Sequence, residues 1–364
     1  MEYMMRFSQL VGSISLGAFL LLGCEGENIT EVSQKETDIS LAERVGPVSQ
    51  YGELLAGQVD GIGHIYGSCD GIAAGKEVQV RGMSMYWSLL PDATMFYSEA
   101  GVSSMVRDMK VEIIRLAIGT TENWGGTAGF LKDPEGQRTL IKQAVQAAVK
   151  NDIYVIIDWH SHTATDQLEE AKQFFAEMAE AYGGYNNVIF EVFNEPTRQS
   201  WDEVRDYANQ VVAVIRQYSD NLVLVGSPNW DQMPHVAIGK EVEDPKNNIA
   251  YTFHYYANTH STWEMGNADK ALAAGLPLFV SEWGTGNSDG KGVPDLAKNQ
   301  RWQDWMNTNK LSSANWSASR INEGTAAFAQ DATPESLVFS ESGNLVKSYL
   351  ETNPDKYTAC KAKK

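Results

Sequence analysis

Short apolar runs alternate with helical patterns along most of the chain, and this alternation restricts its fold more than any other feature. Eight runs have strand character, at residues 78–83, 111–117, 153–159, 188–193, 222–226, 249–255, 277–283 and 312–317. Helical patterns separate them, for example at residues 137–150, 166–182 and 199–218. Strands that alternate with helices form parallel sheets, and eight of them at this chain length predict a (β/α)8 TIM barrel. A doubly wound open sheet is the alternative, but no G-x-G-x-x-G dinucleotide motif follows the first strand.

The chain has 364 residues, 43% of them apolar, which is enough for a large core. We expect a single catalytic domain over residues 51–364, because no second linker, repeat or low-complexity tract interrupts that segment. The stretches GHIYGSC and KEVQVRG predict a short N-terminal hairpin that precedes or includes the first strand and covers the bottom of the barrel. Residues 24–50 are polar and acidic without an apolar period, and they predict a flexible tether.

The first residues have the pattern of an export signal. Arg6 leads into LVGSISLGAFLLLGC, an apolar run too short for a comfortable membrane span. The run ends at Leu21-Leu22-Gly23-Cys24, which is similar to a bacterial lipobox, so we expect residues 1–23 to be a signal peptide and Cys24 to carry lipid. An ordinary secretory peptide with an incidental Cys24 is the alternative. In either case we expect an exported protein, on the outer membrane or cell surface as a lipoprotein, or otherwise periplasmic or secreted.

Charge limits the classes of partner. The formal net charge is −18 and the isoelectric point is about 4.8, which argues against binding to nucleic acid or to anionic lipid head groups. We therefore expect membrane contact only through the N-terminal lipid, and we expect a monomer because a strong net charge keeps molecules dispersed. Two further cysteines, Cys69 and Cys360, lie near the two ends of the domain. Export makes a disulfide between them possible, and two free thiols are the alternative.

Polar and aromatic residues recur where the predicted strands end, which is where TIM barrels place their chemistry. Glu195 follows the fourth strand and Glu282 ends the seventh. Two carboxyl groups about 5–5.5 Å apart across a barrel mouth are the geometry of retaining glycoside hydrolysis. Two structural glutamates in ion pairs are the alternative reading. Glu191 has the same strand parity as Glu195 but lies one pleat deeper, and we interpret it as a buried partner of Arg81 or Arg115.

Other chemistries fit less well. Asp158, His160 and His162 alternate along one segment and suggest a metal site, but no additional cluster of histidine or cysteine ligands accompanies them. The chain also lacks the strand-to-helix G-x-S-x-G elbow that carries the nucleophile of many serine hydrolases. We therefore expect neither a metal nor a cofactor. Tryptophans suit the apolar faces of sugar rings, and four of them follow predicted strands: Trp87, Trp230, Trp283 and Trp316.

Taken together, these strand ends resemble glycoside hydrolase family 5, in its cellulase branch. The motifs that carry the resemblance are FNEP at 193–196, SEWG at 281–284, Arg115 within IIRLA, DWH at 158–160 and FHYY at 253–256. Their order and combination are specific, and the resemblance spans residues 51 to about 349. It implies a (β/α)8 barrel that retains anomeric configuration, with Glu282 as nucleophile and Glu195 as acid/base.

The resemblance also implies a set of supporting roles. Arg115 and Tyr256 are expected to hydrogen-bond the nucleophile, and Asn194 to hold the 2-hydroxyl of the reacting sugar. The resemblance places two histidines, His160 and His254, beside the scissile bond. It also implies three stacking platforms: Trp316 under the reacting sugar, Trp230 on the leaving-group side and Trp87 further toward the non-reducing end.

Two departures from the branch affect substrate choice. Relatives often carry a lysine five residues beyond the platform tryptophan, where this chain has Ile321. Arg320 is the candidate replacement, and Glu323 is a second candidate contact. The loop SMYWSLLP is short and lacks a histidine. We expect an endo-β-1,4-glucanase acting on cellulose or related β-glucans. The alternatives are another β-glycanase, acting on mixed-linkage glucan, xyloglucan or mannan, and a surface glycan-binding lipoprotein without turnover.

Overall fold

The computed structural model describes residues 44–69, 77–121, 128–352 and 357–360. The predicted signal peptide, Cys24 as the predicted lipid site, and the first part of the predicted tether lie outside the described residues. Among the helices that are described, none is both long enough and apolar enough to cross a membrane.

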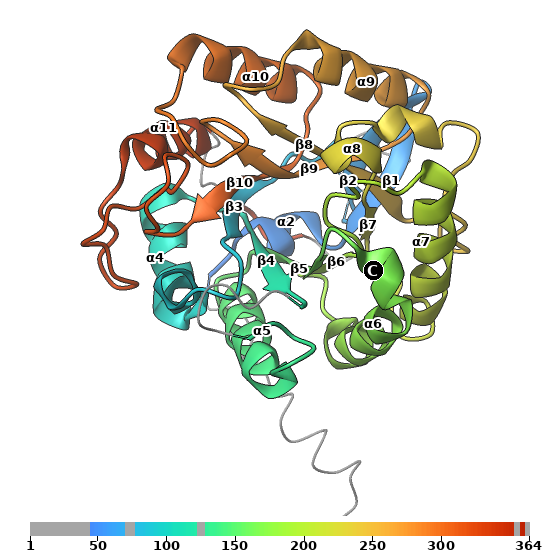
Figure 1. Cartoon of the computed structure of the whole chain (residues 1–364), viewed down its shortest axis with the longest axis horizontal. Coiled ribbons are helices and arrows are strands. Elements are labelled where there is room, and N and C mark those ends of the chain that lie inside the picture. Colours follow the sequence, from blue (N-terminus) through green and yellow to red (C-terminus); the bar gives the residue numbers. More distant parts are fainter. Residues whose placement is uncertain (1–43, 70–76, 122–127, 353–356, 361–364) are drawn as a thin grey trace, which may run out of the picture. The chain divides into compact units, whose positions relative to one another are not determined.

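Eight parallel strands form a closed barrel in the order β10-β3-β4-β5-β6-β7-β8-β9, with helices placed around them (Figure 1). This confirms the predicted fold class. The strand bounds are β3 Arg81–Met85, β4 Ile113–Gly119, β5 Tyr154–His160, β6 Val188–Glu191, β7 Val223–Val225, β8 Ile249–Tyr256, β9 Leu278–Gly284 and β10 Ser313–Ala318. All eight are buried along their length, as expected of parallel strands covered by helices.

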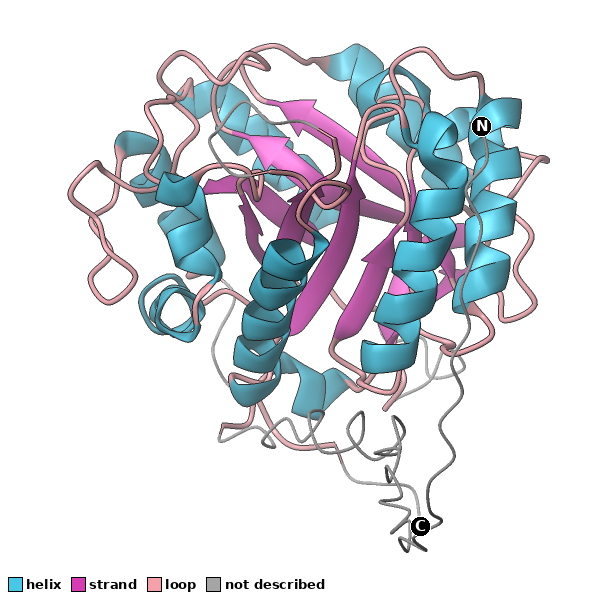
Figure 2. Cartoon of the chain, turned by 60° about the horizontal axis from the view of Figure 1, so that its bottom comes forward, coloured by secondary structure: helices cyan, strands magenta, loops and turns pink. Residues whose placement is uncertain are grey.

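Amphipathic helices follow the strands and pack their apolar faces on the outside of the barrel (Figure 2). The longer helices are α4 Glu99–Met109, α5 Pro134–Lys150, α6 Leu168–Tyr182, α7 Trp201–Ile215, α9 Thr262–Ala273, α10 Leu296–Thr308 and α11 Glu341–Leu350. Helix α7 shows why these segments start where they do. Ser200 and Glu203 form a reciprocal capping box at its first turn, which satisfies amide groups that have no partner within the helix.

The predicted hairpin exists, but its strands differ from the prediction. β1 (Leu54–Val59) pairs with β2 (Ile62–Gly67), whereas the predicted second strand contributes only an isolated bridge between Tyr66 and Glu77. The reason is the turn, because Asp60 and Gly61 both adopt the left-handed conformation that two-residue hairpins favour. Leu54 and Ile65 pack against the residues that begin the barrel strands. The hairpin therefore closes the end of the barrel opposite the carboxyl ends of its strands.

The predicted tether extends too far toward the domain. Residues Pro47–Tyr51 form the short helix α2, in which Pro47 and Val48 are buried. The carboxylate of Asp152 accepts hydrogen bonds from the backbone amides of Gly46 and Ser49, at 2.5 and 3.1 Å. These contacts make the last residues of the predicted tether part of the folded domain. At the same end, Cys69 and Cys360 form a disulfide.

Candidate active site

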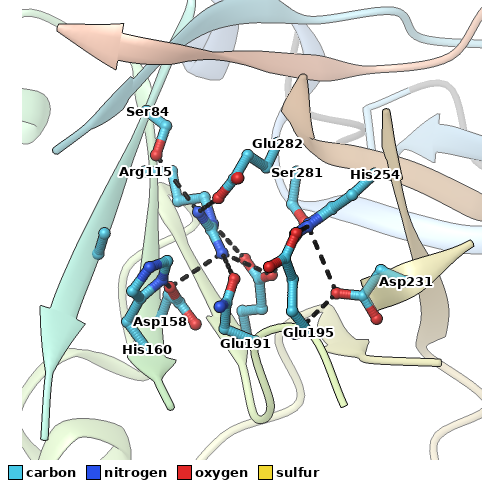
Figure 3. Close-up of polar contacts among 12 residues, drawn as sticks. Ser84, Arg115, Asp158, His160, Glu191, Glu195, Asp231, His254, Ser281 and Glu282 are labelled. Carbon is cyan, nitrogen blue, oxygen red and sulfur yellow. Dashed lines mark hydrogen bonds and ion pairs between the residues drawn. The ribbon is translucent and has the colours of Figure 1, made fainter. Parts of the chain in front are cut away.

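The side chains that the sequence singled out meet at the carboxyl ends of the barrel strands. β4 supplies Arg115, β8 supplies His254 and β9 supplies Glu282, while Asn194 and Glu195 follow β6. A closed parallel barrel brings all strand ends to one rim, so residues far apart in sequence converge there. The contacts among them are drawn in Figure 3.

Arg115 is fully buried and lies at the centre of this cluster. Its guanidinium contacts three carboxylates, those of Glu191 at 2.8 Å, Glu282 at 2.9 Å and Asp158 at 3.0 Å, and it also donates to the side-chain oxygen of Asn194 at 2.7 Å. Glu191 is therefore the partner of Arg115 and not of Arg81. Burial raises the pKa of Glu191, and it raises the pKa of Asp158 to about 7. The positive charge of Arg115 offsets the cost of burying these three carboxylates.

Glu282 is aimed by two donors. Arg115 donates to its Oε2 at 2.9 Å and the Tyr256 hydroxyl donates to its Oε1 at 2.7 Å. Burial, and then the charge of Glu282, raise the pKa of Tyr256, so this hydroxyl remains a donor. The two hydrogen bonds hold the carboxylate in one orientation, as a nucleophile requires.

Glu195 has a different environment. His254 Nδ1 lies 3.1 Å from its Oε1, and His162 Nε2 lies 3.3 Å from its Oε2. Burial acts to raise the pKa of Glu195, but the two histidines outweigh it and hold the pKa below its usual range. Burial acts to lower the pKa of His254, but Asp231 and Glu195 outweigh it and raise the pKa to about 9. The resting site therefore stores its proton on His254 rather than on Glu195.

The two glutamates are close enough to act on one atom. An oxygen of Glu195, a ring nitrogen of His254 and an oxygen of Glu282 all lie within 4.8 Å of one another. Inverting glycosidases need about 6.5–9.5 Å between their carboxyl groups to accommodate a water, whereas retaining enzymes need about 5–5.5 Å. The spacing therefore fits direct attack by one carboxylate.

The same three groups are the set of described residues best placed to hold a metal ion. However, both oxygens of Glu282 already accept hydrogen bonds from Arg115 and Tyr256, and a guanidinium 2.9 Å away disfavours a second cation. Asp158, His160 and His162, which the sequence suggested as metal ligands, do not converge on one point. Asp158 binds His160 Nδ1 at 2.6 Å, whereas His162 turns to Glu195. The absence of a metal stays a prediction.

Two adjoining hollows open over the cluster and share His162, Glu195 and Tyr256 in their walls. The larger, about 530 Å³, is also lined by Trp230, whose side chain is 46% exposed. The smaller, about 260 Å³, lies over Glu282. Its aromatic and acidic walls include Tyr86, Trp87, His160, Trp316 and Glu323.

The predicted platforms lie where a chain of sugars could reach them. The Trp316 ring stacks parallel to the His160 ring at 5.5 Å, and Trp87 meets His160 edge-on at 4.1 Å. Burial lowers the pKa of His160, so it is neutral beside these rings. Trp316 and Trp230 line different hollows on the two sides of Glu195, which is the arrangement expected of platforms on either side of a scissile bond.

Arg320 does not take the place of the missing lysine. Its guanidinium binds Asp92 at 2.7 Å and the carbonyl of Ala332 at 3.1 Å, and it is not among the described residues that line either hollow. Ile321 packs instead against the Tyr86 and Trp316 cluster. Glu323 does reach the wall, where it accepts a hydrogen bond from the Tyr86 hydroxyl at 3.0 Å. Burial raises the pKa of Glu323.

Three contacts at the site were not predicted from the sequence. Asp231 accepts a hydrogen bond from the backbone amide of Glu195 at 3.0 Å, His162 contacts the same carboxylate, and Tyr86 holds Glu323. Each of these residues lies just beyond a predicted strand, so the strand-end rule could have included them. Their side-chain directions depend on loop conformation, which no periodicity encodes.

Comparison with known proteins agrees with this geometry. The family model described as cellulase (glycosyl hydrolase family 5) matches residues 72–322. The chain belongs to glycoside hydrolase family 5. Within this family it is 39% identical over 289 residues to endoglucanase Z of Dickeya dadantii, covering 78% of this chain and 65% of the relative. It is 38% identical to endoglucanase A of Evansella cellulosilytica, covering 71% and 53%. The chain thus spans between about half and two thirds of these two relatives.

Solved structures of the family share the fold. The catalytic domain of Thermobifida fusca endoglucanase Cel5A is 30% identical with a TM-score of 0.74, covering 84% of this chain and 99% of that one. The same domain solved in complex with cellotetraose gives 29% identity and a TM-score of 0.73, with the same coverage.

Proposed function

We propose that the chain is an endo-acting β-1,4-glucanase that hydrolyses cellulose or related β-glucans with retention of configuration. The observation that carries this proposal is the pair Glu195 and Glu282, with an oxygen of each within 4.8 Å of the other. The relatives named as endoglucanases and the family member solved with cellotetraose support this substrate class.

We give each carboxylate a role that its surroundings support. Glu282 attacks the anomeric carbon and forms a glycosyl ester while Glu195 gives a proton to the departing oxygen. Water then attacks the ester, giving its proton to Glu195 and releasing Glu282. Asn194 supports the first step, because its Oδ1 is held by Arg115 while its buried Nδ2 has no hydrogen-bond partner among the described residues. That amide is available to donate to a sugar hydroxyl, a contact that strengthens as positive charge develops on the ring.

The test is reducing-sugar release from carboxymethylcellulose, with parallel assays on mixed-linkage glucan, xyloglucan and mannan. We expect Glu195→Gln and Glu282→Gln each to lose at least about a thousandfold in rate, equivalent to about 4 kcal/mol of barrier. Glu169→Gln, on the exposed face of α6, is the control and should keep the wild-type rate. Near-wild-type activity of either site variant would overturn the role assignment. Activity on mannan or xyloglucan alone would select that β-glycanase, and glycan binding without cleavage would indicate a binding protein.

Stereochemistry separates the two roles. With an activated aryl β-cellobioside, Glu195→Ala in azide should yield the β-glycosyl azide, because Glu282 still forms the ester. Glu282→Ala in azide should yield the α-glycosyl azide by direct displacement. Proton NMR of the first-formed products distinguishes the two, and the reverse pattern would exchange the roles.

Export as a monomeric lipoprotein is part of the same proposal. It is supported by the apolar run before Cys24, the lipobox-like residues around it and the net charge of −18. Expression in a bacterial host with labelled palmitate should label the wild-type chain and leave Cys24→Ala unlabelled. Equal labelling of both would exclude Cys24 as the lipid site, and size-exclusion chromatography of the lipid-free domain tests the monomer.

A further inference from the structure

Asp231 is a fully buried carboxylate that the two-step reaction above does not use. It ends α8 (Pro228–Asp231), the turn that follows β7, and it adopts a left-handed backbone with φ 58°. Its Oδ1 accepts from the amide of Ser227 at 2.5 Å, and its Oδ2 accepts from the amide of Glu195 at 3.0 Å. The same Oδ2 lies 3.5 Å from His254 Nδ1. Figure 3 shows Asp231 and His254 beside Glu195, with Arg115 on the other side.

The hydrogen bonds around His254 require a proton in this group. The single hydroxyl hydrogen of Ser281 goes to Glu191 at 2.9 Å, so the Ser281 oxygen must accept from His254 Nε2, also at 2.9 Å. Nε2 therefore carries hydrogen. Nδ1 faces carboxylate oxygens of Glu195 at 3.1 Å and Asp231 at 3.5 Å. Acceptors surround it, so a proton must lie on Nδ1 or on one of the two carboxyl groups.

The charges facing His254 favour the imidazolium. Its neighbours across the barrel are mostly acidic, and the basic groups nearby are already engaged: Arg115 by Glu191 and Glu282, and His162 by Glu195. The acidic groups that face it are Asp231 after β7, Glu195 and Glu191 of the β6 segment, and Glu282 of β9. Burial raises the pKa of Asp231 to about 7, against about 9 for His254. Between these two values the aspartate is ionised and the imidazole is protonated.

We propose that Asp231 is a positioning residue that keeps a proton on His254 within reach of Glu195 in mildly alkaline solution. When substrate displaces water, this proton passes from Nδ1 to Oε1 of Glu195, leaving a neutral imidazole and a neutral carboxylic acid. Glu195 then gives it to the departing sugar oxygen. Through the Glu195 amide, Asp231 also holds the acid/base residue in its left-handed backbone, with φ 52°. This role rests on the proposed glycosidase function.

Asp231→Asn tests the charge without changing the shape, because the amide oxygen can still accept one backbone hydrogen bond. We expect the alkaline limb of the kcat/KM profile on a soluble β-glucan to move down by about one pH unit or more, the usual effect of an opposite charge within about 4–6 Å. On an activated aryl β-cellobioside, whose departure needs no acid, kcat/KM should change less than threefold. An unchanged alkaline limb, or equal losses on both substrates, would overturn the proposal.

Asp152→Asn is the matched control. Asp152 is also buried, also left-handed with φ 55°, and also accepts two backbone amide hydrogen bonds, but at the opposite end of the barrel. Its variant should keep the wild-type alkaline limb on both substrates. A shift as large as that of Asp231→Asn would show that the limb reports stability rather than protonation of His254, and would also overturn the proposal.

A second measurement does not need activity, and its wild-type arm does not need a folded variant. In intact wild-type protein with nitrogen-labelled histidine, the His254 ring should remain doubly protonated at pH 8. In folded Asp231→Asn the ring should be neutral at that pH. A neutral His254 in the wild type at pH 8 would contradict the proposal, whether or not the enzyme is active. If the wild type cleaves no glycan on the panel while its His254 stays protonated, the proposed function fails and the effect of Asp231 on His254 stands.

Discussion

Glu195 and Glu282 are chemically identical, and their neighbours alone divide the work between them. Glu282 accepts from a guanidinium and a phenol, neither of which gives up its proton near neutral pH. Glu195 accepts from two imidazoles, which can give up theirs. In the proposed mechanism a nucleophile and an acid/base therefore arise from one residue type, because Glu282 has permanent donors and Glu195 has exchangeable ones.

Replacing Tyr256 by Phe tests the permanent donor. The change removes the 2.7 Å hydrogen bond to Glu282 and little else. A hydrogen bond to a charged group contributes about 1.5–3 kcal/mol, so we expect kcat/KM on carboxymethylcellulose to fall roughly 10- to 100-fold. The control is Tyr255→Phe, the next residue along β8. The Tyr255 ring stacks on Trp302 of α10, between the barrel and its helices. The rate of this variant should stay within twofold of wild type. Equal losses in both variants would show damage to the strand instead.

Residue-level prediction from the sequence worked best where a motif and a strand end coincide. Arg115, Tyr256 and Glu282 converge as expected, because a strand dictates which way its side chains point. Asn194 and Glu195 join them because they closely follow β6. Arg320 was wrong for the complementary reason. It lies in a loop, where Asp92 competes for the guanidinium, and that partner is 228 positions away in sequence. The same dependence on loop conformation hid Asp231.

At the scale of elements, the turn α8 combines strain with function. Asn229, Trp230 and Asp231 are three consecutive left-handed residues, and an aromatic side chain is poorly suited to that conformation. The turn is held by the Trp230 amide, which donates to the Pro196 carbonyl at 3.1 Å, and by the Asp231 carboxylate. Left-handed backbone persists only where its surroundings impose it, and here it presents a half-exposed indole to the larger hollow.

Two substitutions at Trp230 separate the strain from the platform. Both Trp230→Gly and Trp230→Ala remove the indole, so both should raise KM for long β-glucans several-fold, and to a similar extent. Glycine tolerates φ 55° and alanine does not, so the glycine variant should be more stable than the alanine variant by about 1 kcal/mol. Urea unfolding measures the difference. If alanine proved the more stable, the turn would not be strained in solution.

The strands and helices themselves were predictable to within a few residues, because eight alternations of two periodicities leave few alternatives. The hairpin was predicted with the wrong partner strand. KEVQVRG has good strand character, but Asp60-Gly61 joins LLAGQV to IGHIYG in a two-residue turn, and local closure costs less chain entropy than a longer connection. Turn chemistry therefore outweighed strand propensity in this element.

At the scale of the domain, the two ends of the barrel differ in what they bury. The carboxyl end carries the proposed catalytic acids and their histidine neighbours, beneath two hollows that a substrate could enter. The opposite end is closed by α2 and by the hairpin, with Leu54 and Ile65 in an apolar cluster. Beyond this cluster, Cys69 and Cys360 join segments 291 residues apart, and the Cys360 amide donates to the Ser49 carbonyl at 2.7 Å. The disulfide and this apolar cluster thus lie at the end away from the candidate active site.

This separation predicts that the disulfide supports stability and not catalysis. In Cys69→Ser/Cys360→Ser the unfolded chain regains the freedom that a long closed loop removes, so the free energy of unfolding should fall by about 2–5 kcal/mol. Because the bridge lies at the opposite end from Glu195 and Glu282, kcat/KM at 25 °C should stay within twofold. Urea unfolding and the carboxymethylcellulose assay test both parts, and reduced wild type should match the variant. A large loss of activity in the folded variant would mean that the two ends of the barrel are coupled after all.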